Sequence, residues 1–189
     1  MEALAERLTN CLLRKNFITA SQSKWCHYMI IHRAMNIISL IVLIPLGAFI
    51  SDWATSLCLV LGYRFLRSRT GGFHAHTPHG CLLSAVAIQV ISLLCLPVLS
   101  TAAFGIKIML CVCSCVSIIL LAPSNNAAVH LTAREIKALK VSIPVRIGIL
   151  LAMTLLLFPI NQLVSTSFLL SITVTAILLI LSKAGFGAQ

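Results

Sequence analysis

The longest uncharged segment of the chain runs from residue 147 to residue 182, between Arg146 and Lys183. As one straight helix it would extend about 54 Å, whereas the hydrocarbon core of a bilayer is about 30 Å thick. A single crossing cannot use that length, and Pro159 and Asn161 stand close to its middle. We therefore expect two membrane-spanning helices, separated by a break near residues 159–162.

The rest of the chain has the same apolar character. Of its 189 residues, 59% are hydrophobic and 10% are charged, whereas about 25% are charged in a typical soluble domain. This composition excludes a soluble globule and predicts an all-α polytopic membrane protein with about six transmembrane helices. The other four expected spans are residues 34–51, 53–66, 80–99 and 104–122.

The first 33 residues differ from the spans. Leu4, Leu8 and Leu12 recur every four residues, whereas charged residues lie mostly elsewhere around the helix. This pattern is typical of an amphipathic helix in the membrane interface, and an ordinary docking helix explains it equally well. We expect one integral membrane domain over residues 1–189, with an interfacial segment (1–33) before a six-span bundle (34–182).

The sparse charges predict the orientation. The chain has 14 Lys and Arg against 4 Asp and Glu, a net charge of +10. Six spans place both termini on one side, together with every basic residue except Lys107. The positive-inside rule makes that side cytoplasmic. The basic excess is therefore explained by membrane topology, and we expect no nucleic-acid partner.

One loop concentrates reactive side chains at the expected cytoplasmic boundary. Residues 67–81 read R-S-R-T-G-G-F-H-A-H-T-P-H-G-C. The Gly71-Gly72 pair allows backbone angles closed to other residues. Thr77-Pro78 is a helix-start signal, so Cys81 should lie in the first turn of the third span. The helix dipole there favours a thiolate, and Arg67 and Arg69 would add to this effect.

Three interpretations of the loop remain open from the residues alone. The first is a nucleophilic pair, in which Cys81 attacks and His74 acts as base. The second is a metal-binding transporter or sensor, with zinc held by His74, His76, His79 and Cys81. The third is a polar interfacial loop without chemistry. The other cysteines fit small apolar helix residues, and we expect no disulfides.

The loop resembles the accessory gene regulator B family, bacterial membrane endopeptidases that process quorum-sensing propeptides. The family pattern R-x-x-A-G-G-Y-H-A with a downstream cysteine is matched by Arg67, Gly71, Gly72, Phe73, His74, Ala75 and Cys81. Thr70 and Phe73 replace the Ala and Tyr of the pattern. The resemblance favours the first interpretation and implies a cysteine endopeptidase with a His74–Cys81 dyad and no cofactor or metal.

The resemblance also implies a mechanism and a partner. Cys81 would cleave off the C-terminal tail of a short propeptide through a thioester, and the peptide would then cyclise to a thiolactone or lactone. Such propeptides have an amphipathic N-terminus and an acidic tail, which Arg134, Lys137, Lys140 and Arg146 would attract. The family resemblance also suggests a homodimer in the bacterial cell membrane.

The resemblance and the helix pattern also give four supporting residues beside the dyad. They are Arg67, Gly71, Gly72 and Ser84. Ser84 and Ser92 lie on the Cys81 face of the third span. They would bind substrate or the oxyanion, or else pack between helices as small polar residues do.

Overall fold

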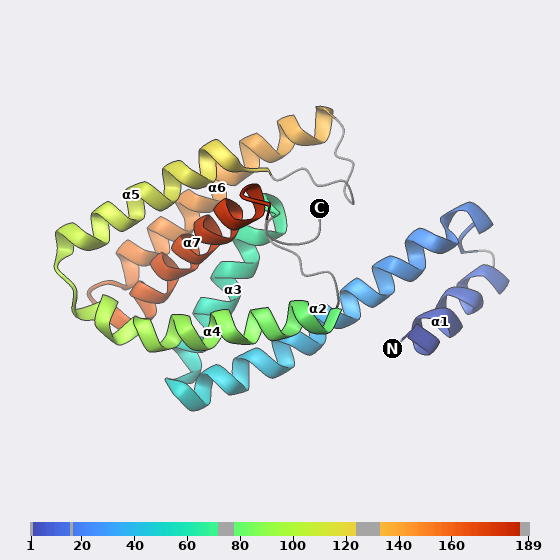
Figure 1. Ribbon diagram of the computed structural model, residues 1–189, viewed down its shortest axis with the longest axis horizontal. Helices are drawn as coiled ribbons and strands as arrows, with labels where there is room; N and C mark the ends of the chain where they lie inside the picture. Colours follow the sequence, from blue (N-terminus) through green and yellow to red (C-terminus); the bar gives the residue numbers. More distant parts are fainter. Residues whose placement is uncertain (1, 16, 72–77, 124–132, 186–189) are drawn as a thin grey trace. The chain divides into compact units, whose positions relative to one another are not determined.

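The structure is a computed structural model that describes residues 2–15, 17–71, 78–123 and 133–185 (Figure 1). Within these residues the fold is all-helical, as predicted, with seven α-helices and no strand. The helices are α1 (Glu2–Arg14), α2 (Ser23–Ile50), α3 (Trp53–Thr70), α4 (Pro78–Thr101), α5 (Phe104–Leu121), α6 (Ala133–Leu157) and α7 (Gln162–Lys183). The chain forms two compact units, Met1–Val42 and Leu43–Gln189.

Unit 1 contains α1 and the first part of α2. The expected amphipathic helix is present as α1, with Glu2 in its first turn and Arg14 in its last, which suits the helix dipole. The first span was expected at residues 34–51, but α2 begins at Ser23. The expected boundary was wrong because hydropathy locates the bilayer crossing, whereas a helix can continue beyond it through polar residues such as Lys24.

Five helices are long and apolar enough to cross a membrane, namely α2, α4, α5, α6 and α7. The expected second span, residues 53–66, is also helical and forms part of α3. The C-terminal half of α3 carries Arg64, Arg67 and Arg69, which give it a less apolar composition than the other five helices. One face of α3 is buried and includes Leu59, Val60 and Leu66.

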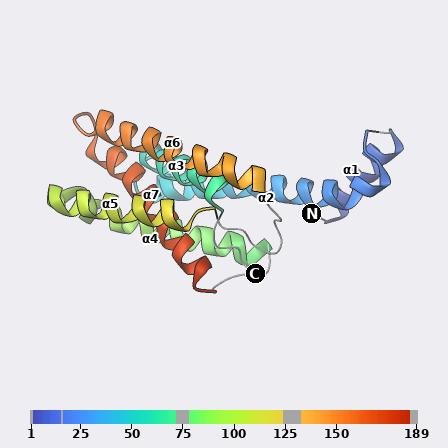
Figure 2. The ribbon, with the colours of Figure 1, turned by 90° about the horizontal axis from the view of Figure 1, so that it is seen from above.

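Helix α7 is the centre of unit 2 and contacts α3, α4, α5 and α6 (Figures 1 and 2). Small hydroxyl side chains connect it to its neighbours. The Ser171 hydroxyl donates to the Leu59 carbonyl of α3 (3.0 Å), and Ser114 of α5 donates to Thr173 (3.3 Å). A Cβ on Gly62 would lie 2.8 Å from Ser171 Oγ, so this glycine allows the close approach of α3 to α7.

The breaks between helices follow the expected signals. The break near residues 159–162 is confirmed, because α6 ends at Leu157 and Asn161 caps α7 by accepting from two backbone N–H groups. The third span was expected at residues 80–99, and α4 runs from Pro78 through Pro97 to Thr101. Membrane helices tolerate an internal proline more readily than soluble helices do.

The basic residues that precede the long uncharged segment are also helical. Arg134, Lys137 and Lys140 lie on the first half of α6, and Arg146 lies further along the same helix. Lysine and arginine are good helix formers, so a basic segment that leads into an apolar span can continue the same helix. The bases therefore occupy fixed positions around α6.

Candidate functional site

Cys81 occupies the predicted position in the first turn of α4, which begins at Pro78. Its side chain is half-buried. The Ser84 hydroxyl donates to the Cys81 carbonyl (2.9 Å), so Ser84 is engaged with the helix backbone beside the cysteine. The thiol thus lies at the positive end of the α4 dipole, where a negative charge on sulfur is favoured.

The C-terminal half of α3 supplies the groups that lie close to Cys81. Tyr63 and Arg64 are near enough to the thiol to interact with its charge. Arg67, one helical turn after Tyr63, donates to the Tyr63 hydroxyl, and its guanidinium lies 5.4 Å from the centre of the Tyr63 ring. Arg67 thus holds the Tyr63 phenol in place on α3.

The backbone at Gly71 ends α3, which continues beyond the expected span of residues 53–66. Gly71 has φ 71° and ψ −148°, and its N–H donates to the Arg67 carbonyl (3.1 Å). A positive φ of this kind favours glycine strongly. Gly72, His74, His76 and the side chain of His79 lie outside the described residues, so the dyad and the zinc site both stay predictions.

Arg146 is separated from the other bases of α6. It donates to the Phe65 carbonyl and to the Ser68 hydroxyl, and its guanidinium lies 4.5 Å from the centre of the Phe65 ring. The sequence grouped it with the bases expected to attract an acidic tail. The structure instead shows Arg146 joining α6 to the last turns of α3, one turn before Gly71.

The other three bases of that group have exposed side chains. Arg134, Lys137 and Lys140 are exposed on α6. All eight cysteines are free in the structure. Among the residues that the structure describes, no three His, Cys, Asp or Glu side chains gather as a metal site.

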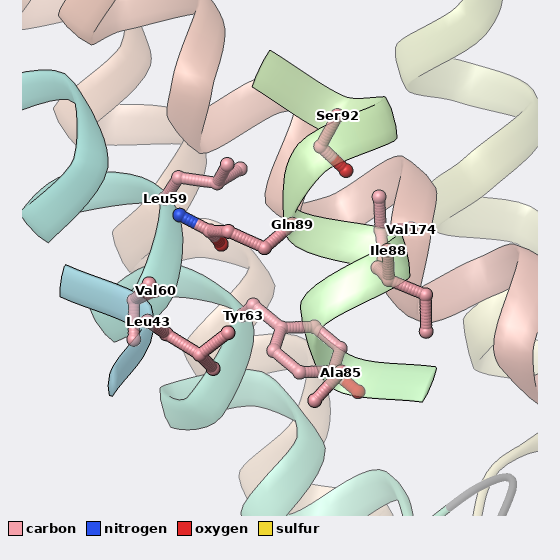
Figure 3. Close-up of a pocket in the computed structure, with 9 residues that line it drawn as sticks. All are labelled: Leu43, Leu59, Val60, Tyr63, Ala85, Ile88, Gln89, Ser92 and Val174. Atoms are coloured by element: carbon pink, nitrogen blue, oxygen red, sulfur yellow. The ribbon is translucent and has the colours of Figure 1, made fainter. Parts of the chain in front are cut away.

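A recess between α3 and α4 was missed by the sequence analysis (Figure 3). Its lining includes Tyr63 and Leu59 of α3, and Ala85 and Gln89 of α4. Gln89 is 5% exposed, and its Nε2 lies 3.5 Å from Ser56 Oγ. A glutamine within an apolar span was the available signal, because a buried amide needs a polar partner.

Three comparisons with known proteins bear on this arrangement. The comparison with curated proteins and the comparison with solved structures each gave no match. The family model described as accessory gene regulator B matches residues 5–180, which is nearly the whole chain and includes both α3 and α4. With Cys81 at the start of α4 and the glycine turn at the end of α3, the chain belongs to the accessory gene regulator B family.

Proposed function

We propose that this chain is a membrane cysteine endopeptidase that removes the acidic tail of a quorum-sensing propeptide and promotes its cyclisation. Membership of the family is consistent with a role in processing quorum-sensing peptides. The observation that carries the proposal is the half-buried Cys81 thiol in the first turn of α4, beside Arg64 of α3.

The proposed reaction has two acyl transfers. His74 takes the Cys81 proton, and the thiolate attacks the peptide carbonyl at the cleavage position. The C–N bond breaks, the amine of the tail takes the proton from His74, and the peptide remains on Cys81 as a thioester. A thiol or hydroxyl of the same peptide then gives its proton to His74 and attacks the thioester. Ring closure releases the Cys81 thiolate, which recovers the proton.

The membrane setting supports cyclisation over hydrolysis. Cys81 begins an apolar helix that is long enough to span a bilayer, and limited water near the thioester slows its hydrolysis. The positive-inside rule supports a cytoplasmic position for the Cys81 end of α4, where a newly made propeptide would arrive. The exposed bases of α6, Arg134, Lys137 and Lys140, are proposed to attract its acidic tail.

Coexpression of variants with the propeptide tests the proposal. Cys81→Ala and His74→Ala are each expected to abolish tail removal, measured by mass spectrometry of the peptide. The matched control is Cys95→Ala, which removes another cysteine of α4 about 21 Å further along the helix. Normal cleavage by either the Cys81 or the His74 variant would overturn the proposal, as would equal loss of cleavage in Cys95→Ala.

A further inference from the structure

The proposed reaction needs a hydrogen-bond donor beside the nucleophile. When Sγ of Cys81 attacks, the peptide carbonyl oxygen becomes an oxyanion, and a fixed donor near that oxygen lowers the barrier strongly. The Ser84 hydroxyl donates to the Cys81 carbonyl (2.9 Å) instead, and Ser92 follows Cys81 by 11 residues, about 16.5 Å along the helix. Neither serine hydroxyl presents its proton beside Sγ, so a side-chain donor has to come from elsewhere in the site.

Tyr63 of α3 lies against the first turns of α4. It lines the same recess as Ala85, and Figure 3 shows its ring beside Ala85, at the opposite end of the recess from Ser92. Ala85 follows Cys81 by four residues, so the two side chains share one face of α4, about one turn apart. The Tyr63 phenol is also near enough to the Cys81 thiol to interact with its charge. The phenol and the nucleophile are therefore neighbours.

Arg67 prepares the Tyr63 hydroxyl to act as a donor. Its guanidinium donates to the phenol oxygen and lies 5.4 Å from the centre of the ring, one helical turn further along α3. A hydroxyl that accepts a hydrogen bond keeps its own proton for donation. A charged donor on the oxygen also polarises the O–H bond, and hydrogen bonds linked in this way strengthen one another.

We propose that the Tyr63 phenol donates a hydrogen bond to the peptide carbonyl oxygen as Cys81 attacks and the oxyanion forms. This proposal rests on the proposed function, and it adds a catalytic residue on a second helix. Arg67 is then a positioning residue, because it acts on the substrate through Tyr63.

The step transfers no proton to or from Tyr63. The Sγ–C bond forms, the π electrons of the carbonyl move to its oxygen, and the phenol O–H donates to that oxygen while it carries the charge. When the C–N bond breaks, the carbonyl forms again and the hydrogen bond weakens. The same donor acts a second time when the thiol or hydroxyl of the peptide attacks the thioester, because that attack charges the same oxygen.

Tyr63→Phe tests the proposal, because it removes the O–H group and keeps the ring. In the full-length protein in detergent, kcat for tail removal should fall about 100- to 1,000-fold. KM should stay within about twofold, because the lost interaction is made only in the transition state. Tyr28→Phe is the matched control. It makes the same change at the chain's other tyrosine, which is 58% exposed on α2, and it should leave kcat unchanged.

Alkylation of Cys81 separates an oxyanion donor from a residue that only shapes the site. Iodoacetamide reacts with the thiolate, but the reaction forms no oxyanion. Its rate at Cys81, measured by mass spectrometry of the peptide that contains this residue, should therefore stay within about twofold in Tyr63→Phe. An unchanged rate also shows that the first turn of α4 keeps its fold in the variant.

Each outcome decides between the donor, another role for Tyr63 and the enzyme itself. A large loss of kcat with an unchanged alkylation rate supports the donor. If cleavage and alkylation fall together, Tyr63 acts on the thiol and the donor is wrong, and normal cleavage by Tyr63→Phe would overturn it as well. If the unaltered protein cleaves no propeptide, or Cys81→Ala cleaves normally, the proposed function fails and the donor fails with it.

Discussion

Asp52 and Asn161 begin two helices of unit 2 in the same way. The Asp52 carboxylate accepts from the Thr55 N–H (2.9 Å) at the start of α3, and the Asn161 carbonyl oxygen accepts from the N–H groups of Leu163 and Val164 at the start of α7. Each side chain satisfies helix N–H groups that have no partner within the helix. The two caps differ in charge, and only the carboxylate can titrate.

This difference predicts a pH-dependent contribution from Asp52. Burial raises the pKa of the Asp52 carboxyl, but hydrogen bonds from Thr55, Ala54 and Ser51 outweigh that effect and bring the pKa below its ordinary value of 3.8. Because the pKa is lower in the folded state, the stabilisation is fully present above pH of about 4. It is lost as the pH falls through the folded pKa.

Alanine substitution at each cap measures the effect. Asp52→Ala should lower the free energy of unfolding by about 1 kcal/mol at pH 7, and by less near pH 3, measured by chemical unfolding in micelles. Asn161→Ala is the control, and its loss should be the same at both pH values. A pH-independent loss in Asp52→Ala would contradict the argument.

Between elements, Arg146 of α6 binds the C-terminal half of α3. Its guanidinium binds the Phe65 carbonyl and the Ser68 hydroxyl, and it lies over the Phe65 ring. A cation near the last turns of a helix is favoured by the helix dipole. Because α3 also carries Tyr63 and Arg64, its position sets the surroundings of Cys81.

Arg146 is therefore expected to act as a positioning residue. Arg146→Gln should lower kcat for propeptide cleavage about tenfold, equivalent to about 1.4 kcal/mol, and leave KM within about twofold, because substrate binding does not use this side chain. Arg146→Lys should restore part of kcat, since an ammonium reaches one acceptor but lacks the planar fork of arginine. Steady-state kinetics on purified protein measures both values.

Arg69→Gln is the control for charge alone. It removes one positive charge from the same end of α3, at an exposed side chain that makes no contact with Phe65 or Ser68 in the described structure. It should change kcat little. Equal losses of kcat in the Arg69 and Arg146 variants would show that charge, and not position, is what matters.

The helices could largely be predicted from the sequence, whereas their ends could not. Apolar runs and the breaks at Asp52 and Asn161 determined where helices separate, because a bilayer requires long apolar helices and local caps end them. The helices α2 and α6 begin earlier in the chain than the apolar segments from which they were predicted. Hydropathy marks only the apolar part of a helix, and both helices begin in segments that contain lysine and arginine.

At the scale of the whole molecule, the packing of α3 on α4 determines what the sequence could not supply. Cys81 and Gly71 were predictable, since local signals for a helix start and a turn mark them. Tyr63 and Gln89 were not, because their roles depend on which helix faces which, and α7 sets that arrangement by contacting both α3 and α4. A contact between two helices has no local signature in one chain.

The distribution of charge over the molecule separates two kinds of basic residue. Arg146 is engaged with α3, whereas Arg134, Lys137 and Lys140 are exposed on the first half of α6. Exposed charges contribute to association by raising the local concentration of an oppositely charged partner. Under the proposed function, that partner is the acidic tail of the propeptide.

Charge reversal tests this assignment. A Lys137→Glu, Lys140→Glu double variant should lower kcat/KM for an acidic-tailed propeptide about tenfold at low salt, mainly through KM, and by less at high ionic strength because salt screens exposed charges. A propeptide whose tail acids are replaced by lysine should regain activity with the variant. The control, Lys183→Glu, reverses an exposed charge at the end of α7 and should leave kcat/KM unchanged.

If instead the double variant processes the acidic and the basic tails equally well, Lys137 and Lys140 do not bind the tail. The positive-inside rule is then sufficient to explain the excess of basic residues on this side of the membrane.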